Sequence, residues 1–327
     1  MTMLETFDRL AQECLSRYRL SPAATATLIN YTENLTYRVD DPASGGRSIF
    51  RIYRAGCRDR EEIASEVEWM SALRRDAGVE TPEIIPARDG TALIILSDAT
   101  LPEPRLCAMF TFLSGTEPPE DRLAESFGRL GEVAARMHLH SRSWPLPSGF
   151  KRPTWNFETM LGGPRPLWGR WQDGMGLDPE REKLLGRLME VVARRLERFG
   201  SGKGQFGLVH ADLRLANLLV EGDQTKVIDF DDCGFGWYLY DLGTALTFME
   251  DRPDAGELVD AWVLGYRRLA TLSRDEEGEI PTFMMLRRMM VMAWIGSHSD
   301  TELARSEGAG YTVGTCRLAS RFLVRFA

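Results

Sequence analysis

The stretch LVHADLRLANLLVEGDQTKVIDFDDCGFGWYLYDL, residues 208–242, decides how the rest of the chain is interpreted. An apolar pair leads into His210-Ala211-Asp212, and Asn217 follows five residues after Asp212. Two further apolar runs lie on either side of the turn Glu221-Gly222-Asp223, and the second run ends at Asp229. Short apolar runs joined by a Gly-Asp turn predict a β-hairpin. The hairpin would bring the loop that carries Asp212 and Asn217 beside Asp229.

Phosphoryl transfer is the chemistry that needs this set of side chains. Asp212 would accept or orient the proton of an attacking hydroxyl group. Asn217 and Asp229 would hold Mg²⁺, a hard cation that takes oxygen ligands and shares them with phosphates. A lone HxD is common, and a strand that ends in Asp is commoner still. The ordered set, with Asn at +5 and an intervening hairpin, is far rarer, and it predicts a kinase-type active site.

The sequences HADLRLAN and VIDFDD resemble the aminoglycoside phosphotransferase/choline kinase family, which has a protein-kinase-like fold. The family includes homoserine kinases, hydroxylysine kinases and a bacterial stress-response kinase. Its usual HGDxxxxN motif has Ala211 in place of Gly here, and Arg214 stands where many members have His or an apolar residue. The resemblance implies Asp212 as the catalytic base, Asn217 and Asp229 as metal ligands, and ATP with Mg²⁺ as cofactors.

Two more acidic residues follow the motif. The resemblance implies that Asp231 is an auxiliary carboxylate, and a solvated loop acid is the alternative. Asp241 lies near the start of the next predicted helix. In the kinase-like fold an Asp at this place bonds the backbone of the catalytic loop, whereas an acid that only favours the helix dipole is the plain alternative. Both interpretations make Asp241 structural.

Composition and charge limit the class of protein. The 327 residues can form one large or two ordinary domains with a real core. A net charge of -8 argues against a nucleic-acid partner and only weakly favours a cationic substrate. Five cysteines without a CxxC pair indicate reduced thiols. There is no signal-peptide pattern and no run of about 18 apolar residues, so we expect a cytoplasmic enzyme without a membrane partner.

The N-terminal part of the chain predicts a small antiparallel sheet with helices. The expected elements are helices over 4–18 and 61–76 and strands over 26–29, 35–39, 48–54 and 107–113. Asp89-Gly90, between the apolar runs 84–85 and 93–95, predicts a further hairpin.

The segment NYTEN, residues 30–34, joins the first two strands. A kinase covers the nucleotide phosphates at this place with a turn whose backbone N–H groups point at them. YTENLTYRV resembles the corresponding loop of the family, and Asn tolerates turn conformations in place of Gly. Asn30, Thr32 and Asn34 are therefore candidate nucleotide-binding residues, and an ordinary hairpin turn is the alternative.

The third strand, SIFRIYR, carries the candidate phosphate cation. Arg51 faces opposite to Phe50 and Ile52 in an alternating strand. The family keeps a cation here, usually Lys and sometimes Arg, so we expect Arg51 to contact the nucleotide phosphates, with Arg54 as its rival by proximity.

Glu66 lies within the apolar stripe of the helix expected over 61–76. A carboxylate on a packed face needs a partner, because an unpaired buried charge is costly. The cation on the third strand is the natural partner, as in the Lys–Glu pair of kinases. A hydrated carboxylate at the edge of the stripe is the alternative.

The strand over 107–113 would lead into the hinge between two lobes, where the family reads adenine through the backbone. Thr111 and Leu113 are therefore candidates for nucleotide contacts. We place the N-terminal lobe at residues 1–113 and the C-terminal lobe at 114–327.

The C-terminal lobe is predicted to be mainly helical. Helical spacing of apolar residues occurs over 121–140, 179–199, 239–249, 255–270, 282–294 and 311–326. His138 and His140 lie two residues apart and so face different directions on a helix, which predicts packing and capping and not a metal site. The methionines of the helix over 282–294 are expected to fill the core.

The segment 144–178 is rich in Trp, Pro and Gly and has no steady period. Its tryptophans are Trp144, Trp155, Trp168 and Trp171. Insertions near this point help to form the acceptor pocket in related kinases, and an aromatic wall could bind a cationic group. The alternative, which we favour, is that the tryptophans attach the segment to the helical lobe.

The sequence thus predicts an α+β, bilobal, protein-kinase-like fold with a small antiparallel N-lobe and a larger helical C-lobe. The predicted activity is ATP-dependent transfer of the γ-phosphate to a hydroxyl of a small molecule of the amino acid, amino alcohol, sugar or aminoglycoside type. A protein Ser/Thr kinase of the stress-response type is the alternative, although the bridge from Asp229 to Asp241 is short for a peptide-docking loop. A nucleotide-binding pseudokinase is a third reading, disfavoured because every catalytic position is filled. The acceptor and the oligomeric state stay open.

Overall fold

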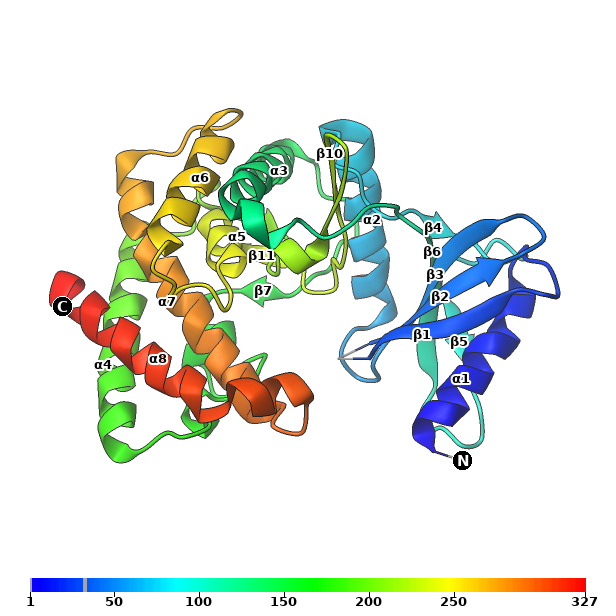
Figure 1. Ribbon diagram of the computed structural model, residues 1–327, viewed down its shortest axis with the longest axis horizontal. Coiled ribbons are helices and arrows are strands. Elements are labelled where there is room, and N and C mark those ends of the chain that lie inside the picture. The colour runs from blue at the N-terminus through cyan, green and yellow to red at the C-terminus, as the bar shows by residue number, and fades with distance from the viewer. Residues whose placement is uncertain (1, 32–33) are drawn as a thin grey trace.

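The computed structural model describes residues 2–31 and 34–327. A lobe built around a β-sheet lies at one end of the molecule and a larger helical lobe at the other (Figure 1). The N-terminal end lies on the sheet lobe, and the chain ends at the far side of the helical lobe. The architecture is therefore α+β and bilobal, as predicted.

The sheet of the small lobe is antiparallel, in the order β1-β2-β3-β6-β4, with β5 also paired to β6. Its strands are β1 Thr25–Tyr31, β2 Leu35–Asp41, β3 Gly46–Ile52, β4 Ile84–Ile85, β5 Ile94–Leu96 and β6 Arg105–Thr111. The alternation of apolar residues in β2 and β3 puts Tyr37, Val39, Phe50 and Ile52 into the core.

The hairpin expected around Asp89-Gly90 is wrong. β4 and β5 do not pair with each other; Ile84 pairs with Phe110 and Ile94 with Cys107, both on β6. The two short strands lie one after the other along the edge of β6 that β3 leaves open, with a loop between them. Both runs form backbone hydrogen bonds with this free edge of β6 and not with each other. The turn at Asp89-Gly90 therefore lies in a loop, after which the chain continues in its earlier direction.

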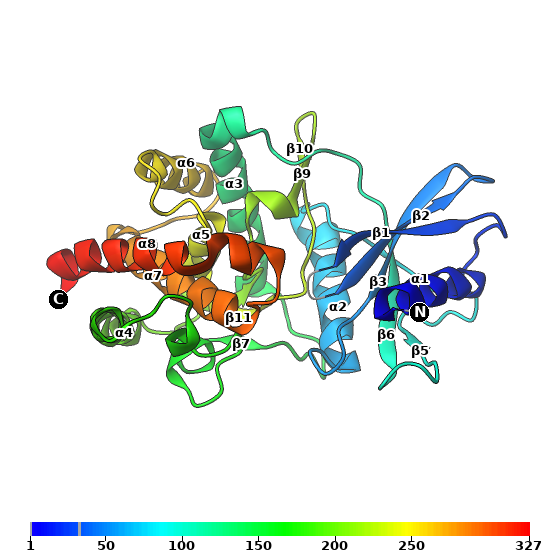
Figure 2. The same ribbon diagram turned by 60° about the horizontal axis from the view of Figure 1, so that its bottom comes forward.

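Two helices flank the small sheet. They are α1 Met3–Cys14, which adjoins β1, and α2 Arg60–Ala77. The views in Figures 1 and 2 agree that α2 lies between the sheet and the helical lobe. Ile63, Trp69 and Met70 of α2 belong to the same buried cluster as the core of the large lobe, whereas Phe7 and Leu10 of α1 belong to a separate cluster within the small lobe. Packing through α2 therefore joins the lobes.

The large lobe contains six α-helices within the described residues. They are α3 Leu123–Ser143, α4 Pro179–Phe199, α5 Tyr238–Ala245, α6 Ala255–Arg267, α7 Arg274–Ser297 and α8 Glu302–Phe326. Its short strands are β7 Thr154–Trp155, β8 Phe206–Val209, β9 Leu218–Glu221, β10 Gln224–Val227 and β11 Gly234–Trp237. The β9–β10 hairpin is antiparallel, as predicted. β11, which was not anticipated as a strand, pairs with β8 and β7.

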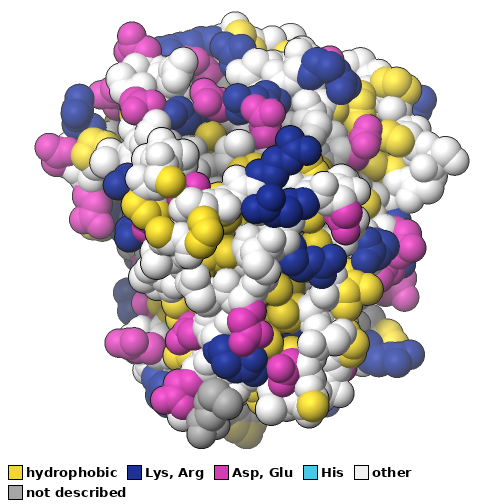
Figure 3. All heavy atoms as spheres, turned by 90° about the vertical axis from the view of Figure 1, so that its right-hand side faces the viewer, with side chains coloured by type: hydrophobic (Ala, Val, Ile, Leu, Met, Phe, Trp, Pro, Cys, Tyr) yellow, Lys and Arg dark blue, Asp and Glu magenta, His cyan; other side chains and the backbone are white. Residues whose placement is uncertain are grey.

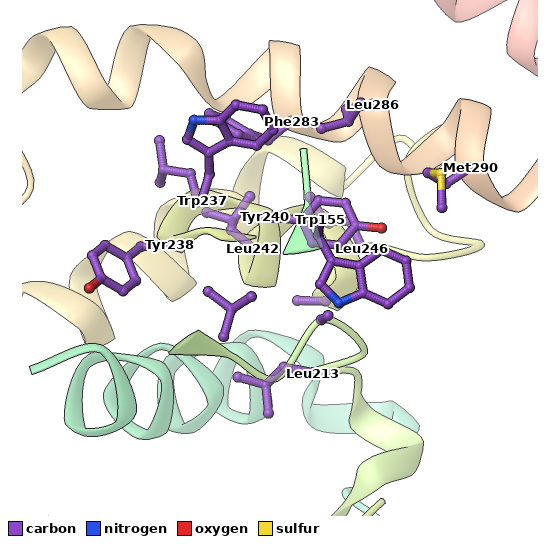
Figure 4. Packing of buried hydrophobic residues seen from close by; sticks show 14 of the residues in the cluster. Trp155, Leu213, Trp237, Tyr238, Tyr240, Leu242, Leu246, Phe283, Leu286 and Met290 are labelled. Atoms are coloured by element: carbon purple, nitrogen blue, oxygen red, sulfur yellow. The ribbon is translucent and has the colours of Figure 1, made fainter. Parts of the chain in front are cut away.

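The buried centre of the large lobe supports the loop after β8. Trp155, Trp237, Tyr240, Phe283 and Leu286 converge there from four segments, and Leu213 packs against the same centre (Figure 4). Met285, Met289, Met290 and Met292 of α7 are buried, which confirms their expected role as core residues, whereas Met284 is half-buried and packs against the same cluster. The loop that carries Asp212 therefore begins from a well-packed part of the core.

On the end of the molecule formed by the small lobe, Lys and Arg side chains are interspersed with Asp and Glu side chains (Figure 3). The net negative charge is therefore not gathered on this face. Among residues 2–31 and 34–327, no helix is long and apolar enough to cross a membrane.

Candidate active site

The loop that follows β8 is held in shape by Asp241, at the start of α5. One carboxylate oxygen of Asp241 accepts a hydrogen bond from the backbone N–H of Ala211 at 2.8 Å, and the other accepts from His210 N–H at 3.2 Å. Ala211 has φ of 66°, in the left-handed region that favours glycine. Asp241 is fully buried and bonds the catalytic-loop backbone, as the family resemblance implied.

The two histidines of α3 pack against other rings. His138 Nε2 lies 2.9 Å from Asp241 Oδ2, and its Nδ1 lies 3.2 Å from the Tyr266 hydroxyl. Burial lowers the pKa of His138, although the bond to Asp241 opposes this shift. His140 lies against the ring of Trp144, with centroids 5.4 Å apart. Both side chains therefore pack, as expected, and His138 in addition supports the loop through Asp241.

Asp212 is surrounded by donors. Arg287 Nη2 donates to its Oδ1 at 2.6 Å, and Asn217 Nδ2 and Arg214 Nε donate to its Oδ2 at 2.9 and 3.2 Å. Burial acts to raise the pKa of Asp212, but the charges of Arg287 and Arg214 outweigh it and hold the pKa below its ordinary value. The carboxylate is therefore ionised at neutral pH and can accept a hydrogen bond from a hydroxyl group.

Asn217 and Asp229 are brought together by the hairpin. The N–H of Ile228, the residue before Asp229, donates to the carbonyl of Asn217 at 3.0 Å. An amide and a carboxylate offer the oxygen ligands that Mg²⁺ prefers. Within the described residues, no group of three or more His, Cys, Asp or Glu side chains could hold a metal ion. This donor set fits an ion that takes its other ligands from phosphates and water.

Arg51 and Glu66 form the expected pair across the small lobe. Arg51 Nη1 lies 3.7 Å from Glu66 Oε1, and its Nη2 lies 3.1 Å from Asp229 Oδ1. Glu66 is only 1% exposed, and burial raises its pKa to about 7, a rise that Arg152 and Arg51 oppose and Asp231 reinforces. Arg51 thus links β3, α2 and the end of the catalytic hairpin.

Arg54, the rival cation, lies outside this network. Its backbone N–H donates to Asn34 Oδ1 at 2.9 Å, and the residue is exposed. The choice of Arg51 over Arg54 therefore agrees with the geometry.

Arg152 is a functional-site residue that the sequence analysis missed. It is buried, and its Nη1 lies 3.7 Å from Glu66 Oε2. Its guanidinium also donates to the carbonyls of Cys233 at 2.6 Å and Phe230 at 3.3 Å, and to that of Asp231. Arg152 thus fixes the backbone just after Asp229. Its place in an irregular segment carried no periodic signal.

The loop expected to cover the nucleotide lines the cleft, whereas the residues of the expected hinge do not. Asn30 and Asn34 line the same cleft as Asp212, whereas Thr32 lies outside the described residues. Thr111 and Leu113 are not among the residues that line this cleft. The N–H and hydroxyl of Thr111 are bonded to the backbone of Glu83 instead.

The cleft that contains these residues has a volume of about 910 Å³, part of it open to solvent. Beyond Asp212 it is walled by Trp168, Thr247, Phe248 and Trp294. Four lining carboxylates face three guanidiniums; they are Asp212, Asp229, Asp231 and Asp232 against Arg51, Arg214 and Arg287. Asp231, whose role was open, is thus at the cleft wall.

The tryptophans of residues 144–178 divide between the two expected roles. Trp155 and Trp171 are buried in the core, and Trp144 packs on Phe150. Trp168 lines the cleft, but the guanidinium carbon of Arg287 lies over its ring, 5.0 Å from the centroid. The cation that contacts the face of Trp168 in the structure is therefore Arg287, a side chain of the protein itself.

Comparison with known proteins agrees with this geometry. Residues 26–276 match the APH phosphotransferase enzyme family. The solved structure of a microcompartment-associated aminopropanol kinase is 41% identical, with a TM-score of 0.89 over 97% of this chain and 98% of its own. An amicoumacin kinase solved with AMP-PNP and Ca²⁺ is 21% identical, with a TM-score of 0.77 over 98% of this chain and 95% of its own.

The amicoumacin kinase of Bacillus subtilis (strain 168) is 23% identical over 295 residues, which cover 87% of this chain and 83% of that protein. The predicted kinase-like fold is thereby confirmed. The chain belongs to the APH phosphotransferase enzyme family and is an ATP-dependent kinase of small-molecule hydroxyl groups.

Proposed function

We propose that the protein transfers the γ-phosphate of Mg²⁺-bound ATP to the hydroxyl of a small amino alcohol. The observation that carries the proposal is the 41% identity, over nearly the whole chain, to a kinase named for aminopropanol. The charges around the cleft do not decide the matter, because Asp212 and Asp229 are paired with lining arginines and Asp232 is paired with Arg58 at 3.3 Å.

In this proposal Asp212 receives the hydrogen bond of the acceptor hydroxyl, orients its oxygen toward the γ-phosphate and takes up its proton. Arg51, already turned into the cleft toward Asp229, contacts the phosphates. Asn30 and Asn34 lie on the small-lobe wall, where they cover the nucleotide. Asn217 and Asp229 would hold Mg²⁺, which would neutralise charge that develops on the phosphate oxygens.

The proposal also divides the chain into an N-terminal lobe of residues 1–113 and a C-terminal lobe of residues 114–327. β6 ends at Thr111, and Ser114 already bonds the β9–β10 hairpin, through Glu221 at 2.8 Å and Lys226 Nζ at 3.0 Å. Because the backbone changes its partners between these positions, the hinge is proposed at residue 113. Adenine contacts are proposed through the backbone of Leu113 and through the carbonyl of Thr111, whose N–H is already bonded to Glu83.

A peptide substrate has less support. Between Asp229 and β11 there are only four residues, and β11 is paired with both β8 and β7. The segment therefore offers no long loop on which a peptide could dock. A small acceptor that enters the cleft fits this arrangement better.

The test is ADP release by purified protein with ATP and Mg²⁺ and a matched set of acceptors. 1-Aminopropan-2-ol, ethanolamine and homoserine probe the amino group and the carboxylate, and propane-1,2-diol replaces the amine of the first compound by an uncharged hydroxyl. We expect the highest kcat/KM for the amino alcohols and at least a tenfold lower value for the diol, since a charge-assisted contact contributes roughly 1.5–3 kcal/mol.

The Asp212→Asn variant serves as the control for contaminating activity. If kcat/KM for propane-1,2-diol equals that for 1-aminopropan-2-ol, the enzyme does not recognise the ammonium group and the proposed substrate class is wrong. A clear preference for homoserine would replace the amino alcohol by an amino acid.

A further inference from the structure

We propose that Arg287, on α7, is the positioning residue for Asp212: it fixes the carboxylate in the one orientation that meets the acceptor hydroxyl. The proposal rests on the role of Asp212 given above. Arg287 is 75 positions away from Asp212 along the chain, and it lies in a helix whose apolar pattern predicts only core packing.

The guanidinium of Arg287 is anchored on all its nitrogens. Nε donates to Thr247 Oγ1 at 2.9 Å, and Nη1 donates to the carbonyl of Ala211 at 3.3 Å and to the Tyr240 hydroxyl at 3.4 Å. Nη2 donates to Asp212 Oδ1 at 2.6 Å. Because each nitrogen has a separate partner, the plane of the guanidinium cannot turn without breaking several bonds, and its position is transmitted to Asp212.

The side chain is also fixed by its surroundings. Arg287 is only 3% exposed, and its guanidinium lies over the ring of Trp168. A buried charge is tolerated when it is paired and fully hydrogen-bonded. The planar fork of Arg can bond Asp212 and the carbonyl of Ala211 at once, so it holds both the side chain and the backbone of the catalytic loop.

The consequence for Asp212 follows from a count of acceptor positions. An ionised carboxylate offers about four lone-pair directions. Arg287 uses one on Oδ1, and Asn217 and Arg214 use two on Oδ2. One direction is left for the hydroxyl of the acceptor. Without Arg287, Oδ1 would lose its donor and the carboxylate could turn away from that direction.

Arg288 is a matched control on the next residue of α7. It is buried to the same degree, but it points away from the cleft and pairs with Glu250 at 2.7 Å and Thr315 at 3.1 Å. Loss of either arginine therefore removes a buried guanidinium from the same helix. Of these two arginines, Arg287 contacts Asp212 and Arg288 does not.

The experiment measures kcat and the two KM values of Arg287→Gln, Arg287→Lys and Arg288→Gln, with the best acceptor of the wild-type protein or, if none is found, with water as acceptor in ATP hydrolysis. We expect Arg287→Gln to lower kcat by about 100-fold, because misplacing a reacting group by about 1 Å costs this much. The KM for ATP should change less than about twofold. Arg287→Lys, which keeps the charge, should recover part of the loss.

A double variant separates positioning from mere stability. If Arg287 acts through Asp212, adding Arg287→Gln to Asp212→Asn should lower kcat by less than about threefold further, since the two residues form one unit. Losses that multiply would overturn the proposal. So would a kcat for Arg287→Gln within threefold of wild type, or an equal kcat loss in Arg288→Gln at a temperature where both are folded.

Outcomes for the proposal and for its basis are distinguishable. If Asp212→Asn keeps its turnover, the role of Asp212 fails and the positioning role of Arg287 fails with it. If Asp212→Asn is inactive while Arg287→Gln is fully active, only the inference about Arg287 fails. Should Arg287→Gln not fold, Arg287→Lys carries the same double-variant comparison.

Discussion

The nucleotide side of the cleft and its acceptor side are assembled from the chain in different ways. Asn217 and Asp229 come from one hairpin of about a dozen residues, and Arg51 reaches them from a strand with clear alternation. The wall proposed to meet the acceptor consists of Trp168, Thr247, Phe248, Arg287 and Trp294, which come from separate segments of the large lobe.

This difference separates the chemistry from the choice of substrate. Phosphate and Mg²⁺ are common to every ATP-dependent kinase, so their contacts can be kept in short motifs. In the proposed function the acceptor would meet side chains on α7 and on irregular segments, where substitutions leave the motifs intact. If the two sides are independent, a substitution on one side should leave the kinetic constants of the other side unchanged.

Asp212 lies between the nucleotide side and the acceptor side of the cleft. Its substitution should have the largest effect on phosphoryl transfer. We expect Asp212→Asn to lower kcat by roughly 10²–10⁴-fold, the usual contribution of a general base. The KM for ATP should stay nearly unchanged, because Asp212 faces the acceptor. Steady-state kinetics with varied ATP and acceptor checks this, and retained turnover would contradict the assignment.

On the nucleotide side, Arg51→Met should lower kcat/KM for ATP by about 10–100-fold. A hydrogen bond to a charged group contributes roughly 1.5–3 kcal/mol, and each 1.4 kcal/mol is tenfold. The KM for the acceptor should hardly move. Arg54→Met is the matched control, because Arg54 is exposed and bonds Asn34 only through its backbone. Equal effects of both variants would argue against Arg51 as the phosphate cation.

On the acceptor side, Trp168→Leu should lower kcat/KM for the acceptor by about 2–30-fold, which corresponds to the roughly 0.5–2 kcal/mol of a cation–π contact with Arg287. ATP binding, followed by calorimetry, should be unaffected. Trp168→Phe keeps an aromatic face and should lose less. A change confined to ATP binding would show that the two sides are not separate.

The smallest effect is expected at Ala211, which stands where the family motif has Gly. A left-handed conformation strains an L-residue by roughly 1–2 kcal/mol, whereas glycine loses about 0.5–1 kcal/mol through its freer unfolded chain. Ala211→Gly should therefore raise stability by about 1 kcal/mol or less, with an unchanged kcat. Thermal unfolding measures the shift, and a lower Tm would mean that the Ala211 methyl group contributes more by packing than it strains.

Residues within one motif or one regular element were predictable from the sequence. The catalytic hairpin, the pairing of Arg51 with Glu66 and the helical lobe follow from apolar period and from charges within apolar stripes. The hairpin at Asp89-Gly90 was not, because a turn signal does not say which strand edge is open. Arg287 and Arg152 were missed because each lies far along the chain from the groups it bonds.

The kind of reaction could therefore be inferred from the amino-acid order alone. The order of Asp212, Asn217 and Asp229, with a short hairpin between Asn217 and Asp229, brings those side chains to the same end of the hairpin. How Asp212 is held and which residues wall the cleft became visible only in the folded chain. Those features depend on which faces of α5 and α7 and which part of residues 144–178 pack together, and no local pattern contains that information.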